Sequence, residues 1–195
     1  MNRTQILPVS FYDRDAVDVA RALLCMRLVR VENGARISGV ISETEAYRGM
    51  EDLGCHAHSG KTKRNAVMFG PPGIAYVYFT YGMHWCLNFV TGVEGSPAAV
   101  LIRAVEPLEG LDVIASRRAG RPRAIWCDGP AKLTQAFGVT GELNGVDLCD
   151  EGSGLFVEEG VQVAKEAILA TPRIGLINVP EPWRGMPWRF TTRGK

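Results

Sequence analysis

Glu43, Glu45 and Tyr47 stand at alternate positions in the chain, a spacing that can assemble a hydrolytic site. Alternate side chains of a strand point to one face, so these three share a face provided that no bulge intervenes. A carboxylate there can activate a water as general base and stabilise positive charge that develops on a sugar. Two neighbouring carboxylates repel, so we expect one to have a raised pKa or to turn away. The plainer alternative is an exposed strand edge.

A hairpin-like, tyrosine-rich segment follows, and it alternates on both sides of residues 81–83. A three-residue turn there pairs Tyr78 with Cys86 and Tyr76 with Asn88, whereas a two-residue turn shifts the pairing by one residue. We adopt the three-residue turn because it gathers the four polar positions on one face. The other face is then predicted to be core, formed by Val77, Phe79, Trp85, Leu87 and Phe89.

The elements that must hold these residues follow from hydrophobic periodicity and turn signals. Helices are predicted over 13–24, where Asp13 can cap, and over 108–117 and 130–137. Strands are predicted over 27–31, 36–47 and 98–105, the first two joined by an Asn33-Gly34 turn, with short strands or turns within 155–163 and 167–176. Residues 48–72 form a long loop. This order predicts an α+β fold with a curved, largely antiparallel sheet (a barrel-like core), flanking helices and a protruding β-hairpin.

The length of 195 residues predicts a single domain, 1–195, that is large enough to bury a core. The composition, 46% apolar and 22% charged, is that of an ordinary globular protein. No apolar run approaches the roughly 18 residues of a membrane span, and the N-terminus is not typical of a signal peptide. We therefore expect a cytoplasmic protein that makes no membrane contact. Five cysteines without regular spacing favour free thiols.

The net charge of +1 does not indicate nucleic acid by itself, but the basic residues are clustered. Basic patches on a near-neutral protein fit a DNA-binding face on one side. Solvated loops are the alternative for each cluster. The clusters are Lys61, Lys63 and Arg64; Arg117, Arg118, Arg121 and Arg123; and the four basic residues between 184 and 195.

Several motifs together resemble the alkyladenine (3-methyladenine) DNA glycosylases, which flip a damaged purine out of DNA and hydrolyse its bond to the sugar. The resemblance covers nearly the whole chain, and it implies the same α+β fold and no cofactor. It is carried by Glu43-Thr-Glu-Ala-Tyr47, the hairpin-like segment 75–90, Arg103-Ala-Val-Glu-Pro-Leu-Glu-Gly110, Gly129-Pro-Ala-Lys-Leu-Thr-Gln135, Pro172-Arg-Ile-Gly175 and Pro187-Trp-Arg-Phe190.

Residue by residue, the resemblance implies that Glu45 is the catalytic glutamate and that Arg103 orients it and the attacking water. Tyr47 and Tyr78 match the pair of tyrosines that stack on the flipped base, with Tyr76 nearby. His56 matches a histidine that borders the flipped nucleotide. Stacking is worth roughly 1–3 kcal/mol per base, which offsets much of the cost of extrusion.

The resemblance also assigns the hairpin tip and one pocket amide. Tyr81 matches a tyrosine that intercalates where the nucleotide has left, and Met83 supports it. Asn88 matches a pocket asparagine that would clash with the exocyclic amine of guanine. The Cys55-His56-Ala57-His58 run lacks the usual zinc spacing, so no metal is expected.

The sequence thus predicts a monofunctional DNA glycosylase of base excision repair that acts on alkylated purines in double-stranded DNA, with deaminated and etheno purines as further candidate substrates. No lysine falls where a Schiff-base nucleophile is required, so an abasic site is the expected product. We expect a monomer, associated with the nucleoid if the source is bacterial. A non-catalytic lesion-binding protein is the alternative, and a carbohydrate glycosidase using Glu43 and Glu45 is a second one.

Overall fold

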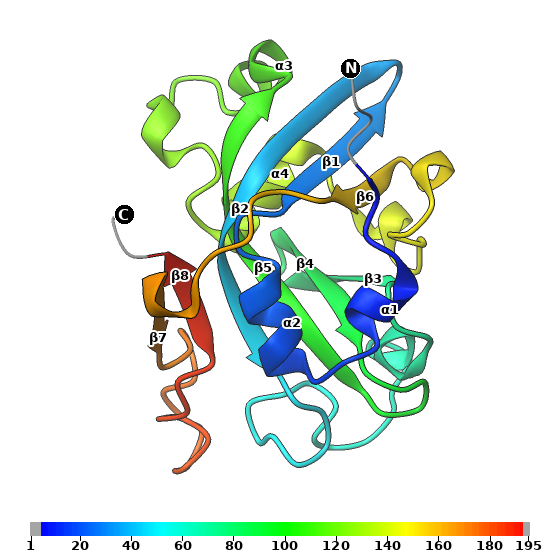
Figure 1. Ribbon diagram of the computed structural model, residues 1–195, viewed down its shortest axis with the longest axis vertical. Coiled ribbons are helices and arrows are strands. Elements are labelled where there is room, and N and C mark those ends of the chain that lie inside the picture. The colour runs from blue at the N-terminus through cyan, green and yellow to red at the C-terminus, as the bar shows by residue number, and fades with distance from the viewer. Residues whose placement is uncertain (1–4, 193–195) are drawn as a thin grey trace.

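A computed structural model describes residues 5–192 and shows one curved antiparallel sheet with helices packed against it (Figure 1). Hydrogen-bonded neighbours follow the order β3-β4-β5-β2-β1-β6, and β8 adds to β2 and carries β7. The α+β prediction is confirmed, with a sheet that does not close into a barrel within the described residues. The strands are β1 (Arg27–Glu32), β2 (Ala35–Tyr47), β3 (Ala75–Thr80), β4 (His84–Thr91), β5 (Ala98–Glu109), β6 (Leu155–Glu158), β7 (Ile168–Thr171) and β8 (Arg189–Thr192).

Four α-helices flank the sheet: α1 (Val9–Tyr12), α2 (Ala16–Ala22), α3 (Leu111–Arg117) and α4 (Pro130–Phe137). The helix predicted over 13–24 is shorter, because Asp15 rather than Asp13 caps it by accepting a bond from the Val17 N–H. Helix α4 has the predicted bounds. Short 3₁₀ turns complete the chain at η1 (Ala66–Phe69), η2 (Arg123–Ile125), η3 (Gly141–Leu143), η4 (Glu151–Ser153) and η5 (Lys165–Ala167).

The sheet has one largely apolar face and one mixed face. Helices α2 and α4 pack on the apolar face, where strand residues such as Ala75, Val77, Leu87, Phe89, Val100 and Ile102 join the main core. The alternate residues of the same strands point the other way. On this second face a smaller cluster forms from Cys55, Ala57, Met68, Tyr76, Val90 and Ala99.

The long strand β2 changes face in its middle. Ile41 pairs with Val105, Glu43 with Ala104 and Thr44 with Ile102. Ser42 is therefore an extra, unpaired residue on β2, and Arg103 is one on β5. Ile41 and Ala46 consequently enter the same core, which strict alternation forbids. The alternation along β2 is therefore interrupted at Ser42, so Ile37 and Ile41 do not share a face with Glu45 and Tyr47.

The β3–β4 hairpin has the predicted register, in which Tyr78 lies opposite Cys86 and Tyr76 opposite Asn88. Its apolar face is less buried than predicted. The side chain of Phe79 is 44% exposed and packs on Trp85 at 4.8 Å between ring centroids. The hairpin tip extends past the body of the core, so its outermost apolar pair is left near solvent.

Residues 48–72 form the predicted loop, but it is tightly ordered by buried groups. Asp52, Cys55, Ala57 and Asn65 are buried, and Asn65 donates to the carbonyls of His56 and Gly60. In Figure 1 this loop closes the end of the sheet at which β2 finishes. It therefore supplies one wall of the mixed face.

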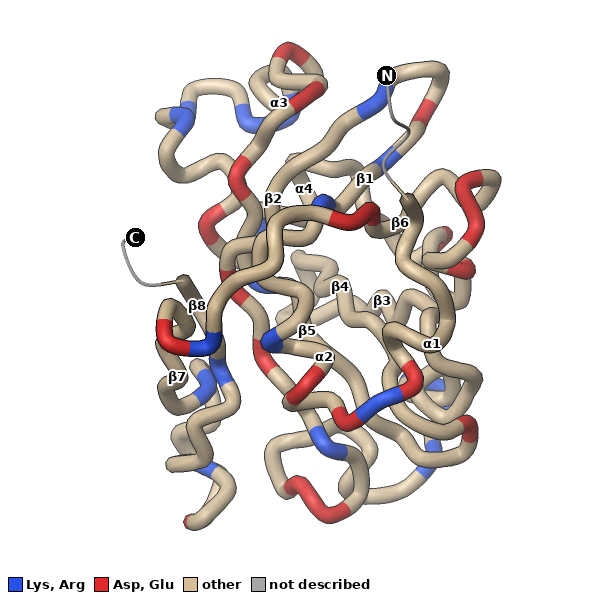
Figure 2. The backbone as a smooth tube through the Cα atoms, in the orientation of Figure 1, with Lys and Arg blue, Asp and Glu red and all other residues tan. Residues whose placement is uncertain are grey.

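The basic clusters are not gathered on one side of the molecule, and Figure 2 shows acidic and basic segments interspersed. Arg117 pairs with Glu32, and Arg118 is buried against Gln135, so both arginines hold local structure. Lys61, Lys63 and Arg64 are exposed. Arg193 and Lys195 lie outside the described residues. Among residues 5–192, no helix combines the length and apolar character that a bilayer crossing needs.

Candidate active site

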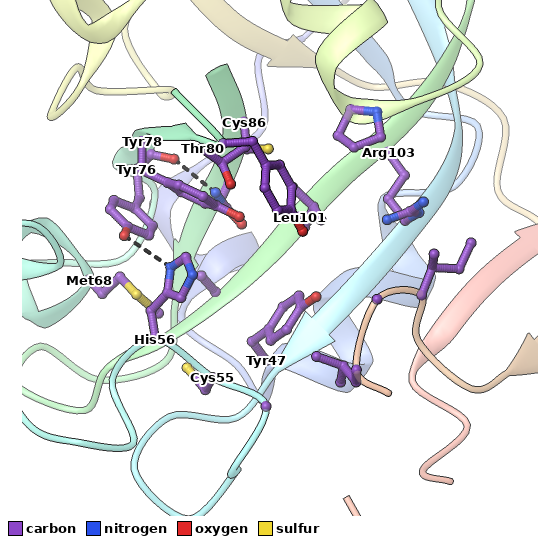
Figure 3. Close-up of a pocket in the computed structure, with 18 residues that line it drawn as sticks. Tyr47, Cys55, His56, Met68, Tyr76, Tyr78, Thr80, Cys86, Leu101 and Arg103 are labelled. Carbon is purple, nitrogen blue, oxygen red and sulfur yellow. Dashed lines mark hydrogen bonds between the residues drawn. The ribbon is translucent and has the colours of Figure 1, made fainter. Parts of the chain in front are cut away.

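A cavity of about 250 Å³ opens on the mixed face of the sheet (Figure 3). This is slightly below the size of pockets that hold drug-sized ligands, and it suits a single flat ring system. The β-strands contribute Tyr47, Tyr76, Tyr78, Thr80, Cys86, Asn88, Ala99, Leu101 and Arg103 to its wall. The loops contribute Gly54, Cys55, His56, Tyr81, Ile174, Gly175 and Leu176, and Met68 of η1 and Pro130 of α4 complete the lining. Apart from Glu45 and Met83, the predicted site residues line one cavity.

Glu45 lies immediately behind this wall, with a side chain that is 0% exposed. Its Oε1 accepts a bond from the backbone N–H of Ile174 at 2.7 Å, and its Oε2 accepts one from the Tyr47 hydroxyl at 2.9 Å. Arg103 Nη1 is 3.3 Å from the same Oε2. The carboxylate is therefore sealed by groups that themselves line the cavity.

Burial raises the pKa of Glu45, because a charged carboxylate is poorly solvated there. The nearby Arg103, the Ile174 N–H and the Tyr47 hydroxyl oppose this shift without cancelling it. A carboxylate with a raised pKa is a stronger base than a solvated one. Such perturbed groups beside a cavity are typical of catalytic sites.

Glu43 turns to the other side of Arg103. Its Oε1 accepts bonds from Arg103 Nε at 2.7 Å and from Arg189 Nε at 2.6 Å. It lines a separate surface groove together with Ser42 and Arg189, and it does not line the cavity. The two neighbouring carboxylates thus lie in different environments, as expected: Glu45 has the raised pKa, and Glu43 turns away. The bulge at Arg103 lets one guanidinium contact both carboxylates.

Three rings form one wall of the cavity (Figure 3). Tyr76 and Tyr78 stack with centroids 5.3 Å apart, and the His56 ring meets Tyr78 edge-on at 4.5 Å. His56 Nδ1 is 3.3 Å from the Tyr76 hydroxyl. Burial raises the pKa of Tyr76 to about 12, and it lowers the pKa of His56, with Arg64 adding to that lowering. Both side chains are therefore neutral near pH 7.

Tyr47 lies across the cavity from this ring wall (Figure 3). The Arg173 guanidinium packs on its outer side, 4.7 Å from the ring centroid. Between Tyr47 and Tyr78 there is space bounded by aromatic faces, the environment that a flat heteroaromatic ring prefers. Asn88 closes the inner end of this space. Its Nδ2 donates to the Tyr76 carbonyl at 3.1 Å, which fixes the plane of the amide.

The hairpin tip stands beside the cavity mouth. Tyr81 is 86% exposed and Met83 is 66% exposed, unusual values for side chains of this size. Tyr81 and Gly82 both have a positive φ, 52° and 66°, and this turn points the Tyr81 side chain away from the core. The tip is therefore a projecting apolar feature, as predicted.

Three participants were missed by the sequence analysis: the Ile174 N–H, Arg173 and Asp52. Arg173 and Ile174 belong to the Pro172–Gly175 motif, which was quoted without a role. Asp52 precedes His56 in a loop that gave no structural signal. The position of a backbone N–H next to Glu45 depends on a contact between residues 129 positions apart, and such contacts leave no local pattern.

The cysteine and the two histidines of the 55–58 run point in different directions. Cys55 is buried, His56 faces Tyr76, and His58 Nδ1 lies 3.3 Å from the Met50 carbonyl. Within the part of the chain that the structure describes, no group of three or more His, Cys, Asp or Glu residues is arranged to hold a metal ion.

Known proteins are similar in sequence to this chain over almost its full length. The sequence pattern of the methylpurine-DNA glycosylase (MPG) family matches residues 10–195. A protein of Carboxydothermus hydrogenoformans named "Putative 3-methyladenine DNA glycosylase" is 51% identical over 185 residues, 95% of this chain and 94% of its own length. A Methanocella arvoryzae protein of the same name is 50% identical, with 95% and 91% covered. A third, from Burkholderia lata, is 46% identical, with 97% and 88% covered. The chain therefore belongs to the methylpurine-DNA glycosylase family, and it is a DNA-repair enzyme that hydrolyses N-glycosyl bonds.

Proposed function

We propose that this enzyme flips an alkylated purine from duplex DNA into the cavity and hydrolyses its N-glycosidic bond with a water activated by Glu45. One observation carries the proposal: a buried carboxylate with a raised pKa lies directly behind an aromatic cavity beside a projecting tyrosine. The carboxylate supplies the general base of the reaction, the rings supply a slot for the flipped purine, and Tyr81 supplies a wedge.

The chemistry needs only a small number of groups. A purine methylated at a ring nitrogen carries a positive charge, so it leaves as a neutral base when the bond between C1′ and the ring nitrogen breaks. The water oxygen bonds to C1′ while Glu45 takes one proton of that water and later returns it to solvent. Arg103 holds the carboxylate in place, and the ionised carboxylate stabilises the positive charge on the sugar. The product is an abasic site with an intact strand.

Tyr47 has two parts in this scheme. Its ring forms one face of the base slot, and its hydroxyl donates to Glu45 Oε2. A water that reacts must take up a position within hydrogen-bond distance of the same carboxylate. We therefore expect the reacting water to bind at a lone pair of the carboxylate that the Tyr47 hydroxyl does not use.

Selectivity follows from the neutral ring wall and the fixed amide of Asn88. Cationic alkylated purines stack more strongly on electron-rich tyrosines than normal bases do. The Asn88 amide is held by the Tyr76 carbonyl, so it would disfavour any guanine through a clash with the exocyclic amine, and 7-methylguanine overcomes this penalty because its cationic ring leaves readily. Rejection of this kind is needed because undamaged bases are in vast excess.

Engagement of the duplex is assigned to the hairpin tip and the neighbouring basic cluster. Tyr81, supported by Met83, fills the gap left by the flipped nucleotide, as wedge side chains do in minor-groove proteins. Lys61, Lys63 and Arg64 are exposed on the adjoining loop and suit phosphate contacts. Lys132 instead forms an i,i+4 ion pair with Asp128, as a helix-surface residue does.

The test is an excision panel with the full chain. Duplexes carry one 7-methylguanine, 3-methyladenine, hypoxanthine or 1,N6-ethenoadenine, and the products are analysed before and after alkali. We expect abasic sites from the cationic lesions first, and strand breaks only after alkali. Lesion-specific binding without any excision would instead support a lesion-binding protein, and excision with direct strand cleavage would contradict the water mechanism.

A further inference from the structure

We propose that the buried Asp52–Arg173 ion pair is a positioning device for the excision site, which places the Ile174 N–H on Glu45 and the Tyr47 ring against the cavity. This inference rests on the function proposed above. It assigns a role to the Pro172–Gly175 motif, which no step of the proposed reaction uses directly.

The pair is fully enclosed. Both side chains are 0% exposed, and the contact is two-pronged, with Arg173 Nη1 2.5 Å from Asp52 Oδ2 and Nη2 2.8 Å from Oδ1. Arg173 also donates to the carbonyls of Ala46 at 3.0 Å and Trp183 at 3.2 Å. Its guanidinium lies over the rings of Tyr47 at 4.7 Å and Trp188 at 5.0 Å. Only an arginine offers a flat face and a donor fork at once.

The position of the Ile174 N–H depends on this pair. The chain between β7 and β8 contains no α-helix or strand, so regular hydrogen bonding does not hold residue 174 in place. Its neighbour Arg173 is fixed to β2 through the Ala46 carbonyl and to the 48–56 loop through Asp52. The amide that donates to Glu45 is therefore anchored one residue away from the donor itself.

The same pair joins the two walls of the cavity. Asp52 accepts bonds from the backbone N–H groups of Arg48, next to Tyr47, and of Gly54, two residues before His56. On the other side, the Arg173 guanidinium supports the outer face of Tyr47. A shift of Arg173 would thus move the base slot and the carboxylate environment together.

Structural support alone is the alternative explanation. A buried ion pair often contributes little net stability compared with well-packed apolar residues, so stability is a weak reason for its presence. The two explanations differ in what happens to Glu45. The groups that face its carboxylate are Tyr47 and Glu43 from β2, Arg103 from β5, Cys86 from β4 and the Ile174 N–H. Two of these groups depend on Arg173: the Tyr47 ring packs on its guanidinium, and the Ile174 N–H belongs to the next residue in the chain.

The experiment compares Asp52→Asn and Arg173→Lys with the full-length parent under single-turnover conditions on a 7-methylguanine duplex. We expect the maximal excision rate constant to fall about 10–100-fold, as for groups that orient a reacting centre, while lesion-DNA affinity changes less than about 3-fold. The acid midpoint of the pH–rate profile should move to higher pH, because a displaced Ile174 N–H no longer stabilises the ionised carboxylate.

Arg36→Gln is the matched control. It removes an arginine that pairs with the buried Glu158 at the opposite end of β2, far from the cavity. We expect it to lower thermal stability while the rate constant and the acid midpoint stay at the parental values. If Asp52→Asn does not fold, Arg173→Lys, which retains the cation, decides the outcome.

The inference is overturned if a folded variant of the pair keeps the parental rate and acid midpoint, or if it loses rate only as much as Arg36→Gln does. An active parent with such variants would contradict the positioning role and leave the proposed function intact. A parent that excises no lesion would contradict the proposed function itself.

Discussion

The two glutamates of β2 are two residues apart and share an arginine, yet they occupy opposite environments. Glu45 is sealed behind the aromatic cavity, and its carboxylate meets one backbone N–H, one tyrosine hydroxyl and the distal part of Arg103. Glu43 lies at a surface groove, where one of its oxygens accepts from both Arg103 and Arg189. Burial raises the pKa of Glu45. Glu43 does not line the aromatic cavity.

This difference shows that residue type and sequence position do not decide which carboxylate is suited to act as a base. The Glu43 carboxylate is held by two arginines at a groove, away from the aromatic cavity. The Glu45 carboxylate is buried, and its partners do not fully offset the cost of burying its charge, so its pKa is raised. It remains basic and lies within reach of the reacting atoms.

The largest expected effect is the loss of excision in Glu45→Gln. General-base contributions are typically 10²–10⁴-fold, so we expect a fall of about 1,000-fold in the single-turnover rate constant. Glu43→Gln should lower it by less than about 10-fold. Affinity for lesion DNA, measured in parallel, should change little in either variant. Equal losses in the two variants would remove the functional distinction between the carboxylates.

Substitution of Arg103, which contacts both glutamates, should have an intermediate effect on the excision rate. Arg103→Gln frees both carboxylates and leaves Glu45 without its charged partner, so we expect a rate loss of about 10–100-fold. Arg189→Gln removes a cation that pairs with Glu43 and does not pair with Glu45, and a change within about 3-fold is expected. Both rates come from the same single-turnover assay. A larger effect from Arg189→Gln would show that the outer groove takes part in the reaction.

The Tyr47 hydroxyl should affect the pH profile more than the maximal rate. It donates to Glu45 and so lowers the pKa of that carboxyl, which means that Tyr47→Phe should move the acid midpoint of excision to higher pH. Tyr12→Phe is the control, since that buried hydroxyl has no hydrogen-bond partner among residues 5–192 and lies on the other face of the sheet. An unchanged midpoint in Tyr47→Phe would show that the hydroxyl does not bond to the carboxylate in solution.

The smallest expected effect is an increase in the free energy of unfolding in Glu45→Gln. The folded-state pKa of Glu45 is raised, so its contribution to stability is full below the unfolded pKa and is lost as pH rises through the folded pKa. Glu45→Gln should therefore stabilise the fold at neutral pH by about 0.5–2 kcal/mol and have little effect near pH 3. Denaturant unfolding at both pH values measures this, with Glu43→Gln as the comparison. A gain that is equal at both pH values would not come from ionisation.

The sequence contained enough local signal to predict the hairpin and the cavity walls. Alternation on both sides of Gly82 fixed the register that brings Tyr76, Tyr78 and Asn88 to one face, and this register is confirmed. Pro130 and Gly138 marked the ends of α4 correctly. These features depend on residues within a few positions of one another, which is why a single sequence reveals them.

The missed features depend on long-range contacts. The extra residues Ser42 and Arg103 lie on opposite strands and cancel in the overall register, and neither is marked by glycine or proline. Strand β8 was not predicted, because a four-residue strand at the edge of β2 is too short to show a period. The Asp52–Arg173 pair joins positions 121 residues apart. The resemblance of motifs gave the site residues, but it did not show what holds them.

The most direct test of the account is the pH dependence of 7-methylguanine excision at acid pH, measured with the parent, Glu43→Gln and the residual activity of Glu45→Gln. We predict one ionisation at a pH above the usual range of a glutamate, present in the parent and in Glu43→Gln and absent in Glu45→Gln. An ionisation that persists in Glu45→Gln, or that disappears in Glu43→Gln, would contradict the assignment of Glu45 as the base.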